Sequence, residues 1–369
     1  MKKRGLKVEH QFQVLESVRQ KGPLSRIDLS KQLKLSKPSI SSLVDELLSL
    51  GYLKEMGKSE STARGGRRPI GLVFNPQNRY CLGVDIGGTK TLIVLTDLNG
   101  DEVVSQTCPT SNKVDDIIVI IQSFIDDSKV DRDRILGMGI SLAGIVDSKN
   151  GTVVDSPNLN WEHVPLVQML QRYFPFPIFI NNDANCAIYA EKLKGHGLNS
   201  RNLVFVTVGT GVGAALIIND QLIEGHHFSA GEIGYLIDRV DVELSNFSSM
   251  GEFGPFEKRV SGKFLSETYG SSEQLFQDYY AGSARAKKIV NQFATDISIA
   301  IANIINIVNP EKVIIGGGVS RSMEGILDFI RKSVSGFTPM EVTIELSALG
   351  NNGCAIGAAA YTYNKIPEL

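Results

Sequence analysis

The sequence predicts a chain of two parts, a small α+β unit at the N-terminus followed by a two-lobed α/β body. Two observations predict the body: residues 82–100 and residues 204–220 each form an apolar strand, a Gly/Thr turn and a second apolar strand. The N-terminal unit is predicted by one observation: apolar residues recur at helical spacing within a basic segment. A chain of 369 residues is long enough for more than one domain, each with its own core.

Charge is distributed unevenly along the chain. Residues 1–70 hold 15 Lys and Arg against 7 Asp and Glu, a balance of +8, whereas the remainder holds 23 against 33, a balance of −10. A basic segment joined to an acidic body suggests a nucleic-acid module attached to a small-molecule domain. Chance variation of surface charge is the alternative explanation.

The first fifty residues predict three helices. Residues 10–20 carry apolar side chains at helical spacing and end before Gly22-Pro23. A second helix is expected to start with Ser25 as its N-cap and to turn Ile27 inward. A third is expected from Ser36, with proline in its first turn, to a stop at Gly51.

Two helices joined by a short turn are typical of DNA-binding helix-turn-helix units, in which the second helix enters the major groove. The small donors and the cation of that helix suit phosphates and base edges, and the candidates are Ser36, Lys37, Ser39, Ser41 and Ser42. Two strands, 52–55 and 70–74, flank a segment rich in Gly, Ser and Arg. This segment is the expected wing, with Arg64, Arg67 and Arg68 reaching the minor groove or its phosphates. A helical protein-binding module is the alternative.

The glycine turns of the body are candidate phosphate sites. Gly87 and Gly88 let backbone N–H groups approach an anion, Thr89 adds a hydroxyl, Lys90 adds a cation, and Asp85 suits a water bound to Mg2+. The second unit repeats the design, with Gly209, Thr210, Gly211 and Gly213. Each turn alone is weak evidence because such turns also simply reverse the chain, but together they suggest two lobes closing on one nucleotide.

Polar residues also follow the predicted strand 177–180. Asp183 is placed to accept the proton of an attacking hydroxyl, and Asn182 to hydrogen-bond a neighbouring hydroxyl. Helix N-capping is the alternative role for both residues. Gly144 follows another buried strand, at the end where open α/β sheets bind ligands, although a plain turn would look the same.

The chain resembles the ROK family (repressors, open reading frames, sugar kinases) of the hexokinase and actin-like ATPase superfamily. Six motifs carry the resemblance and stand in family order over residues 80–360: Asp85-Ile-Gly-Gly-Thr-Lys90, Gly139-Ile-Ser-Leu-Ala-Gly-Ile-Val-Asp147, Asn181-Asn-Asp-Ala-Asn185, Gly209-Thr-Gly-Val-Gly213, Ala230-Gly-Glu-Ile-Gly-Tyr235 and Ile314-Ile-Gly-Gly-Gly-Val-Ser320. The N-terminal segment resembles the winged helix-turn-helix of the family's regulators.

The resemblance implies a winged helix over 1–75 and a two-lobed actin-like ATPase (hexokinase/ribonuclease H-like) fold. The lobes are expected at 80–185 plus 352–369 and at 186–351. It also implies a sugar pocket that includes Gly144, Asn182, Asp183, Glu232 and Tyr235, and ATP with Mg2+ as possible cofactors. The third glycine loop, Gly316, Gly317 and Gly318, would lie by the adenosine.

The resemblance also has a departure. Tyr235 stands where the family has a zinc-binding histidine, and Ser248, Met250 and Pro255 stand where it has three cysteines. Since no soft tetrahedral ligand set remains, we expect no structural zinc and no metal-ligating residues, with packing around Phe247, Phe253 and Phe256 in place of the zinc site.

The scattered cysteines, Cys81, Cys108, Cys186 and Cys354, form no CxxC pair and are expected to be small buried residues. No apolar run reaches the roughly 18 residues that cross a bilayer, and the start lacks a secretion signal, so a cytoplasmic protein is expected.

These observations favour a sugar-responsive transcriptional regulator, a repressor of carbohydrate genes. Its expected partners are operator DNA, a sugar or sugar-derivative effector, and further copies of itself in a dimer or tetramer. An ATP-dependent hexose or N-acetylhexosamine kinase that carries a DNA-binding domain is the alternative, because the phosphate loops and Asp183 are intact. A structural or protein-interaction role in which the motifs are relics is the third interpretation.

Overall fold

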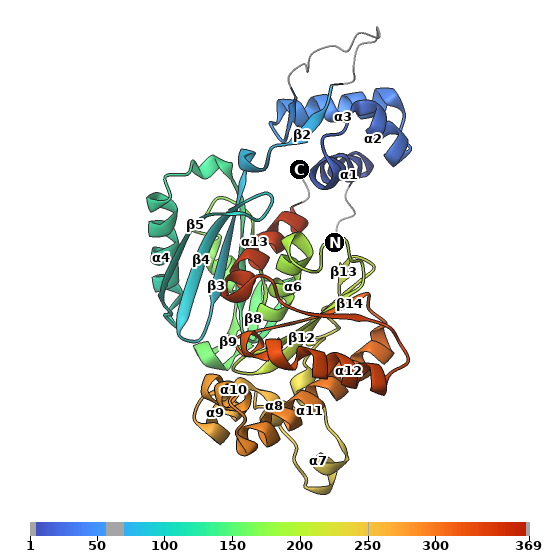
Figure 1. Ribbon diagram of the computed structural model, residues 1–369. Coiled ribbons are helices and arrows are strands. Elements are labelled where there is room, and N and C mark those ends of the chain that lie inside the picture. The colour runs from blue at the N-terminus through green and yellow to red at the C-terminus, as the bar shows by residue number, and fades with distance from the viewer. Residues whose placement is uncertain (1–4, 57–69, 250, 367–369) are drawn as a thin grey trace.

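The computed structural model describes residues 5–56, 70–249 and 251–366, so Arg64, Arg67 and Arg68 lie outside the described residues. Figure 1 shows a small helical head at one end of the molecule, formed by α1, α2 and α3, above a body in which two sheets carry helices. The C-terminal helix α13 lies in the body beneath α1, although the two are at opposite ends of the sequence.

The head contains the three expected helices. They are α1 (Leu6–Lys21), α2 (Arg26–Leu33) and α3 (Lys37–Ser49). Ser25 and Asp28 form a reciprocal capping box at the start of α2, and Ser36 caps α3. Ile27 does not face inward as expected: it is 45% exposed, because Leu29 is the side chain of that turn that reaches the core.

The head is completed by two short strands, β1 (Leu53–Glu55) and β2 (Leu72–Phe74), paired antiparallel. Its apolar core is continuous with the body, since Cys81, Leu98 and Tyr363 belong to the same buried cluster as the head residues. A short helix, η1 (Pro76–Asn78), joins the two parts.

A five-stranded mixed sheet forms the first half of the body. Its order is β10-β6-β3-β4-β5, with bounds β3 (Tyr80–Ile86), β4 (Lys90–Asp97), β5 (Glu102–Pro109), β6 (Ile135–Leu142) and β10 (Ile178–Asn182). Helix α4 (Val114–Asp127) contributes to its main apolar cluster. Helices α6 (Asp183–Lys194) and α13 (Gly353–Lys365) contact each other, and α13 packs on β3 and β6.

A three-stranded antiparallel sheet lies beside the ends of this larger sheet. It contains β7 (Ile145–Asp147), β8 (Thr152–Ser156) and β9 (Trp161–Val164). Short helices complete this half, namely η2 (Arg132–Arg134), η3 (Pro157–Leu159) and α5 (Leu166–Leu170).

The second half of the body repeats the pattern with the order β13-β12-β11-β14-β15. The strands are β11 (Leu203–Val208), β12 (Val212–Ile218), β13 (Gln221–Leu222), β14 (Lys312–Gly316) and β15 (Thr343–Leu346). Its helices are η4 (Ile233–Tyr235), α7 (Arg239–Glu243), α8 (Glu257–Val260), α9 (Gly262–Tyr269), α10 (Ser272–Tyr280), α11 (Ala284–Val308), η5 (Ser320–Ile326), α12 (Leu327–Phe337) and η6 (Gly350–Asn352). The largest apolar cluster joins α11 and α12 to this sheet.

The expected aromatic packing in place of a zinc site is only partly present. Phe256 is buried in the large apolar cluster of the second half of the body. Phe247 is 59% exposed, so the expectation for Phe247 is wrong. Phe247 lies in the loop after α7, where the Asp241–Arg259 ion pair rather than an aromatic cluster ties the segment to α8.

Two further expectations concern the cysteines and membrane spans. All four cysteines are free; Cys81 and Cys186 are buried, whereas Cys108 and Cys354 are half-buried. Within the described ranges no helix has both the length and the apolar character needed to cross a membrane.

Candidate functional site

A cavity of about 380 Å3 opens where loops from both halves of the body face each other. The ends of β3, β6 and β10 contribute to one side and the β11–β12 turn to the other. This cavity is called the cleft below. Eleven of the predicted site residues line it: Gly87, Gly88, Gly144, Asn182, Asp183, Gly209, Thr210, Gly211, Gly213, Glu232 and Tyr235.

Of the other predicted residues of the body, Asp85, Thr89 and Lys90 lie at or next to the first glycine turn, and Gly316, Gly317 and Gly318 lie at the end of β14. Asp85 is half-buried at the end of β3 and accepts a hydrogen bond from the Ser141 hydroxyl at 2.8 Å. Thr89 and Lys90 are exposed at the β3–β4 turn. The third glycine loop reaches the second one, since a Cβ on Gly209 would lie 3.8 Å from the backbone nitrogen of Gly318.

Asn182 and Asp183 have different local roles. The Asn182 side chain caps α6 by accepting a hydrogen bond from the backbone N–H of Asn185 at 2.7 Å. Asp183 is the first residue of the helix, and its carboxylate accepts a hydrogen bond from the N–H of Ala184 at 2.8 Å. The capping role therefore falls to Asn182, and Asp183 lines the cleft.

Three carboxyl groups in and below the cleft hold protons more tightly than usual. Burial raises the pKa of Asp85 to about 7, opposed by the Ser141 hydrogen bond and reinforced by the charge of Asp183. Burial also raises the pKa of Glu232 to about 7, with the charges of Asp183 and Glu257 adding to the effect. The pKa of Asp183 is raised by burial as well. Such shifts are typical of ligand and catalytic sites.

The region that replaces the zinc motif is held by hydrogen bonds. The Tyr235 hydroxyl donates to the carbonyl of Glu252 at 3.0 Å and accepts from the N–H of Gly251 at 3.1 Å. The Ser248 hydroxyl donates to the carbonyl of Phe253 at 2.7 Å. Among the residues that the structure describes, no group of three or more His, Cys, Asp and Glu is arranged to hold a metal. The absence of zinc stays a prediction.

The glycine loops leave space for a phosphate chain but supply little positive charge. An added Cβ at Gly318 would meet nothing within 4 Å, so the space beside this glycine is open. However, the Glu257 carboxylate already accepts the N–H of Val212 at 2.8 Å, and its Oε1 would lie 2.0 Å from a Cβ on Gly211. The described residues lining the cleft include five Asp and Glu but no Lys, Arg or His. A nucleotide there would need Mg2+ to offset this charge.

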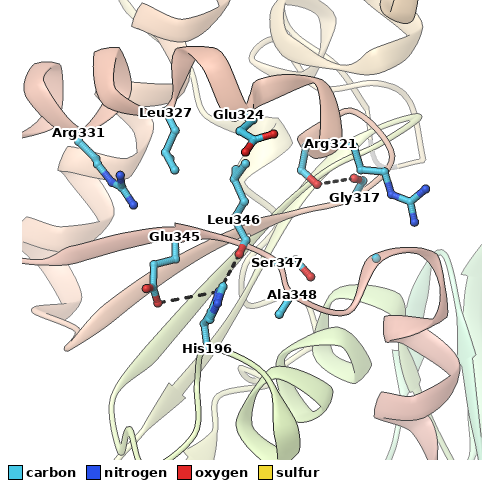
Figure 2. A pocket seen from close by; sticks show the side chains of 12 residues that line it. His196, Gly317, Arg321, Glu324, Leu327, Arg331, Glu345, Leu346, Ser347 and Ala348 are labelled. Carbon is cyan, nitrogen blue, oxygen red and sulfur yellow. Dashed lines mark hydrogen bonds and ion pairs between the residues drawn. The ribbon is translucent and has the colours of Figure 1, made fainter. Parts of the chain in front are cut away.

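The third glycine loop opens on a second cavity of about 560 Å3. Figure 2 shows that β15 contributes Glu345 and Leu346 to it and that His196 lies opposite them. The His196 Nδ1 atom lies 2.8 Å from the carbonyl of Leu346 and 4.0 Å from Glu345 Oε2. Gly317 lines this cavity rather than the cleft. The three glycine loops, which the sequence predicts to bind one nucleotide, therefore line two different cavities.

Six polar or aromatic residues of the cleft were missed as site residues. They are Asp155, Asn158, Thr207, Glu252, Phe253 and Glu257. The turn Asp155-Ser-Pro-Asn158 after an apolar segment was a usable signal, because polar residues at strand ends commonly face ligands. The contact of Glu257 with the β11–β12 turn joins residues 45 positions apart and has no local signal.

The predicted DNA-contacting residues of the head lie on the first turns of α3. Ser36, Lys37, Ser39 and Ser42 are exposed, whereas Ser41 is half-buried. The Ser36 hydroxyl is occupied in part, because it accepts from the N–H of Ser39 and lies 2.8 Å from the Ser39 hydroxyl. The exposed Lys37 side chain supplies the positive charge of this turn.

Similarity to known proteins agrees with this architecture. The model of the ROK family matches residues 81–365, and the chain therefore belongs to the ROK family. It is 31% identical over 371 residues to the xylose repressor of Bacillus spizizenii (strain ATCC 23059 / NRRL B-14472 / W23), covering 96% of this chain and 95% of that protein.

Two solved structures are similar in fold. A ROK family transcriptional regulator, described as a homologue of the Escherichia coli MLC protein, superposes with a TM-score of 0.83 at 24% identity, covering 97% of this chain and 96% of the other. A ROK family glucokinase from Streptomyces griseus, in complex with glucose and AMPPNP, gives a TM-score of 0.66 at 25% identity, covering 77% of this chain and 99% of its own. The body thus has the fold of ROK sugar kinases.

Proposed function

We propose that the protein is a sugar-responsive transcriptional repressor of carbohydrate genes. The observation that carries the proposal is the similarity to a xylose repressor along 96% of the chain, which includes the head. The glucokinase from Streptomyces griseus, by contrast, matches over 77% of this chain. A regulator of this kind acts in the cytoplasm, where its DNA is.

In this proposal residues 1–75 are a winged helix that binds operator DNA. The order of three helices and a two-stranded antiparallel sheet supports it, as do the exposed first turns of α3. Arg64, Arg67 and Arg68 would act from the segment between β1 and β2. Because operators are commonly two-fold symmetric, the regulator would act as a dimer or a higher oligomer.

The body would hold the effector between a lobe of residues 80–185 plus 352–369 and a lobe of residues 186–351. Asp183, Glu232 and Asn182 supply acceptors and donors for sugar hydroxyls, with Tyr235 and Gly144 completing the pocket. The absence of Lys, Arg and His among the described lining residues favours an uncharged carbohydrate over a sugar phosphate. Closure of the lobes on the sugar would change how the heads bind DNA.

An ATP-dependent sugar kinase carrying a DNA-binding domain is the second candidate. The raised pKa of Asp183 and the open space at Gly318 support it, because a buried carboxylate can accept the proton of a sugar hydroxyl. Bound Mg2+ would offset the phosphate charge, and Asp85 is the residue placed below the first loop to hold its water.

One experiment separates the two candidates. ATP turnover by the full chain is measured with a panel of pentoses, hexoses, N-acetylhexosamines and polyols, alongside thermal unfolding with the same sugars. A regulator shows stabilisation by one sugar without turnover, and Asp183→Asn abolishes that stabilisation. Turnover that is lost in Asp183→Asn establishes the kinase instead. If no sugar in the panel stabilises the protein, the proposed effector class is wrong.

The DNA-binding half of the proposal has its own test. The full chain is incubated with a random-sequence duplex library at low salt, and the retained duplexes are sequenced. Enrichment of one inverted repeat supports an operator-binding dimer, and recovery of unenriched DNA or none contradicts it.

A further inference from the structure

Helix α13 contacts three elements that end at the cleft. A Cβ on Gly83 of β3 would lie 2.0 Å from the carbonyl oxygen of Ala355, and a Cβ on Gly139 of β6 would lie 1.9 Å from that of Ala358. On the opposite side of the contact, a Cβ on Gly357 would lie 1.8 Å from the carbonyl oxygen of Cys186 in α6. Because these backbones are in direct packing contact, a shift of the strands or of α6 must also move α13.

Each of these three elements reaches the cleft directly. Strand β3 runs into the turn of Gly87 and Gly88, β6 runs into the turn of Gly144, and α6 begins at Asp183. A ligand that repositions any of these groups therefore acts on α13 through rigid packing.

The C-terminal turns of α13 contact the head. The Tyr363 hydroxyl donates a hydrogen bond to Glu16 Oε1 on α1 at 3.0 Å, and the Tyr363 ring lies 6.1 Å from the Phe12 ring. Arg19 holds the same carboxylate from the other side, with Nε 2.9 Å from Oε1 and Nη2 2.6 Å from Oε2. Tyr363 is only 4% exposed, and the Glu16 and Arg19 side chains are 18% and 13% exposed.

The Tyr363 hydroxyl is a dependable donor in this contact. Burial raises the pKa of Tyr363 well above its ordinary value, so the group stays protonated at any physiological pH. A donor to a carboxylate in a low-dielectric site makes one of the stronger hydrogen bonds of a protein.

The space next to this contact is open. A cavity of about 480 Å3 lies between α1, α6 and α13, with Phe12, Glu16, Arg19, Tyr189, Lys192 and Tyr363 among its lining residues. On its other side the head is tied to the body by the linker, where Asn75 and Asn78 donate to the carbonyls of Gly51 and Leu50. The head is thus tied to the body at the linker and through the shared buried cluster, and the cavity leaves one side of the Tyr363–Glu16 contact unpacked.

We propose that Tyr363 and Glu16 are positioning residues that couple the ligand state of the cleft to the orientation of the head. The inference rests on the proposed function. Movement of α13 by about 1 Å is enough to break a hydrogen bond of this length, and the Glu16–Arg19 pair on α1 then loses its partner in the body. The ligand alters DNA binding because the two lobe arrangements differ in this contact.

The test uses the full chain, a labelled duplex enriched by that chain from a random library, and three probe sugars, D-xylose, D-glucose and N-acetyl-D-glucosamine. The dissociation constant for the duplex is measured with and without each sugar, and the sugar affinity is measured without DNA. In the wild type we expect the effective sugar to change the duplex dissociation constant by about tenfold or more.

Tyr363→Phe and Glu16→Gln are expected to reduce that change to below about threefold, while each keeps its sugar affinity within about threefold of wild type. The double variant should behave like either single variant, since both remove the same interaction. Tyr173→Phe, which alters a tyrosine that is 49% exposed, is the matched control and should keep the full change.

A purely structural role would lower thermal stability and both affinities but leave the ratio with and without sugar intact. The inference is overturned if both Tyr363→Phe and Glu16→Gln keep the full ratio. A wild type that binds one of the sugars and the duplex, yet shows no change of duplex affinity, overturns the proposed function itself, which is a different outcome.

Discussion

Glu232 is a residue whose chemistry depends on its place in the cleft. In the sequence it is one acidic residue of a Gly-rich turn, but in the structure Asp183 and Glu257 are close enough to raise its pKa, after burial, to about 7. A neutral Glu232 donates a hydrogen bond and an ionised one only accepts, so this side chain can present either function to a ligand near neutral pH.

A pH-dependent stability difference follows for Glu232→Gln. The folded pKa of about 7 lies above the ordinary value of 4.5, so the stability linked to the bound proton is present at low pH and lost as pH rises towards 7. We expect Glu232→Gln to gain about 2–3 kcal/mol relative to wild type between pH 5 and pH 8, measured by urea unfolding. Glu267→Gln, at an exposed site, should differ from wild type by a constant amount, and a constant difference for Glu232→Gln would contradict the prediction.

At the scale of elements, α13 illustrates how a run of small residues is used. Most residues of the segment Gly353-Cys-Ala-Ile-Gly-Ala-Ala-Ala360 have small side chains or none, yet most of the helix is buried. The reason is that Gly83, Gly139 and Gly357 remove side chains from the contacts, so that backbones meet. Backbones packed this closely cannot accommodate an added methyl group without strain.

The matched pair Gly139→Ala and Gly336→Ala tests this packing. A Cβ at Gly139 would lie 1.9 Å from a backbone oxygen of α13, whereas one at Gly336 of α12 meets nothing within 4 Å. We expect Gly139→Ala to destabilise the protein by about 3 kcal/mol, and Gly336→Ala to stabilise it by about 0.5–1 kcal/mol through helix propensity. Differential scanning calorimetry of both variants checks the signs, and equal effects would show that the contact is not rigid.

At the scale of the whole molecule, charge is separated between the two parts. The basic excess lies in residues 1–70 and the acidic excess in the remainder of the chain, where the described residues that line the cleft include no Lys, Arg or His. In the proposed complex, the phosphate backbone of DNA would attract the basic segment and repel the acidic body, which would orient the molecule as it approaches DNA.

This separation predicts how salt affects DNA binding. We expect Lys37→Ala to reduce the slope of log affinity against log salt by about one, because Lys37 lies exposed on the first turn of α3. Lys332→Ala, at an exposed position in the body, should leave the slope unchanged. Fluorescence anisotropy with the enriched duplex from 50 to 200 mM salt provides the measurement. Equal slopes for Lys37→Ala and wild type would place α3 away from the phosphates.

The sequence by itself predicted the three helices of the head, the two strand–turn–strand units of the body and eleven of the residues that line the cleft. Caps such as Ser25 and Ser36, and the strand–turn–strand units around Gly87 and Gly209, are local patterns whose chemistry is complete within a few residues. They could therefore be predicted, as could the clustering of Asn182 and Asp183 at a strand end.

The tertiary structure alone decided what depends on distant pairs. Glu257 contacts the second glycine loop, Gly317 faces a cavity separate from the cleft, and Tyr363 bonds to Glu16 across 347 positions of sequence. The residues near these positions in the sequence do not indicate these contacts. Side-chain exposure, pKa and hydrogen-bond partners depend on which distant segments the folded core brings together. The same reason explains why Ile27 and Phe247, apolar residues at plausible inward positions, are exposed.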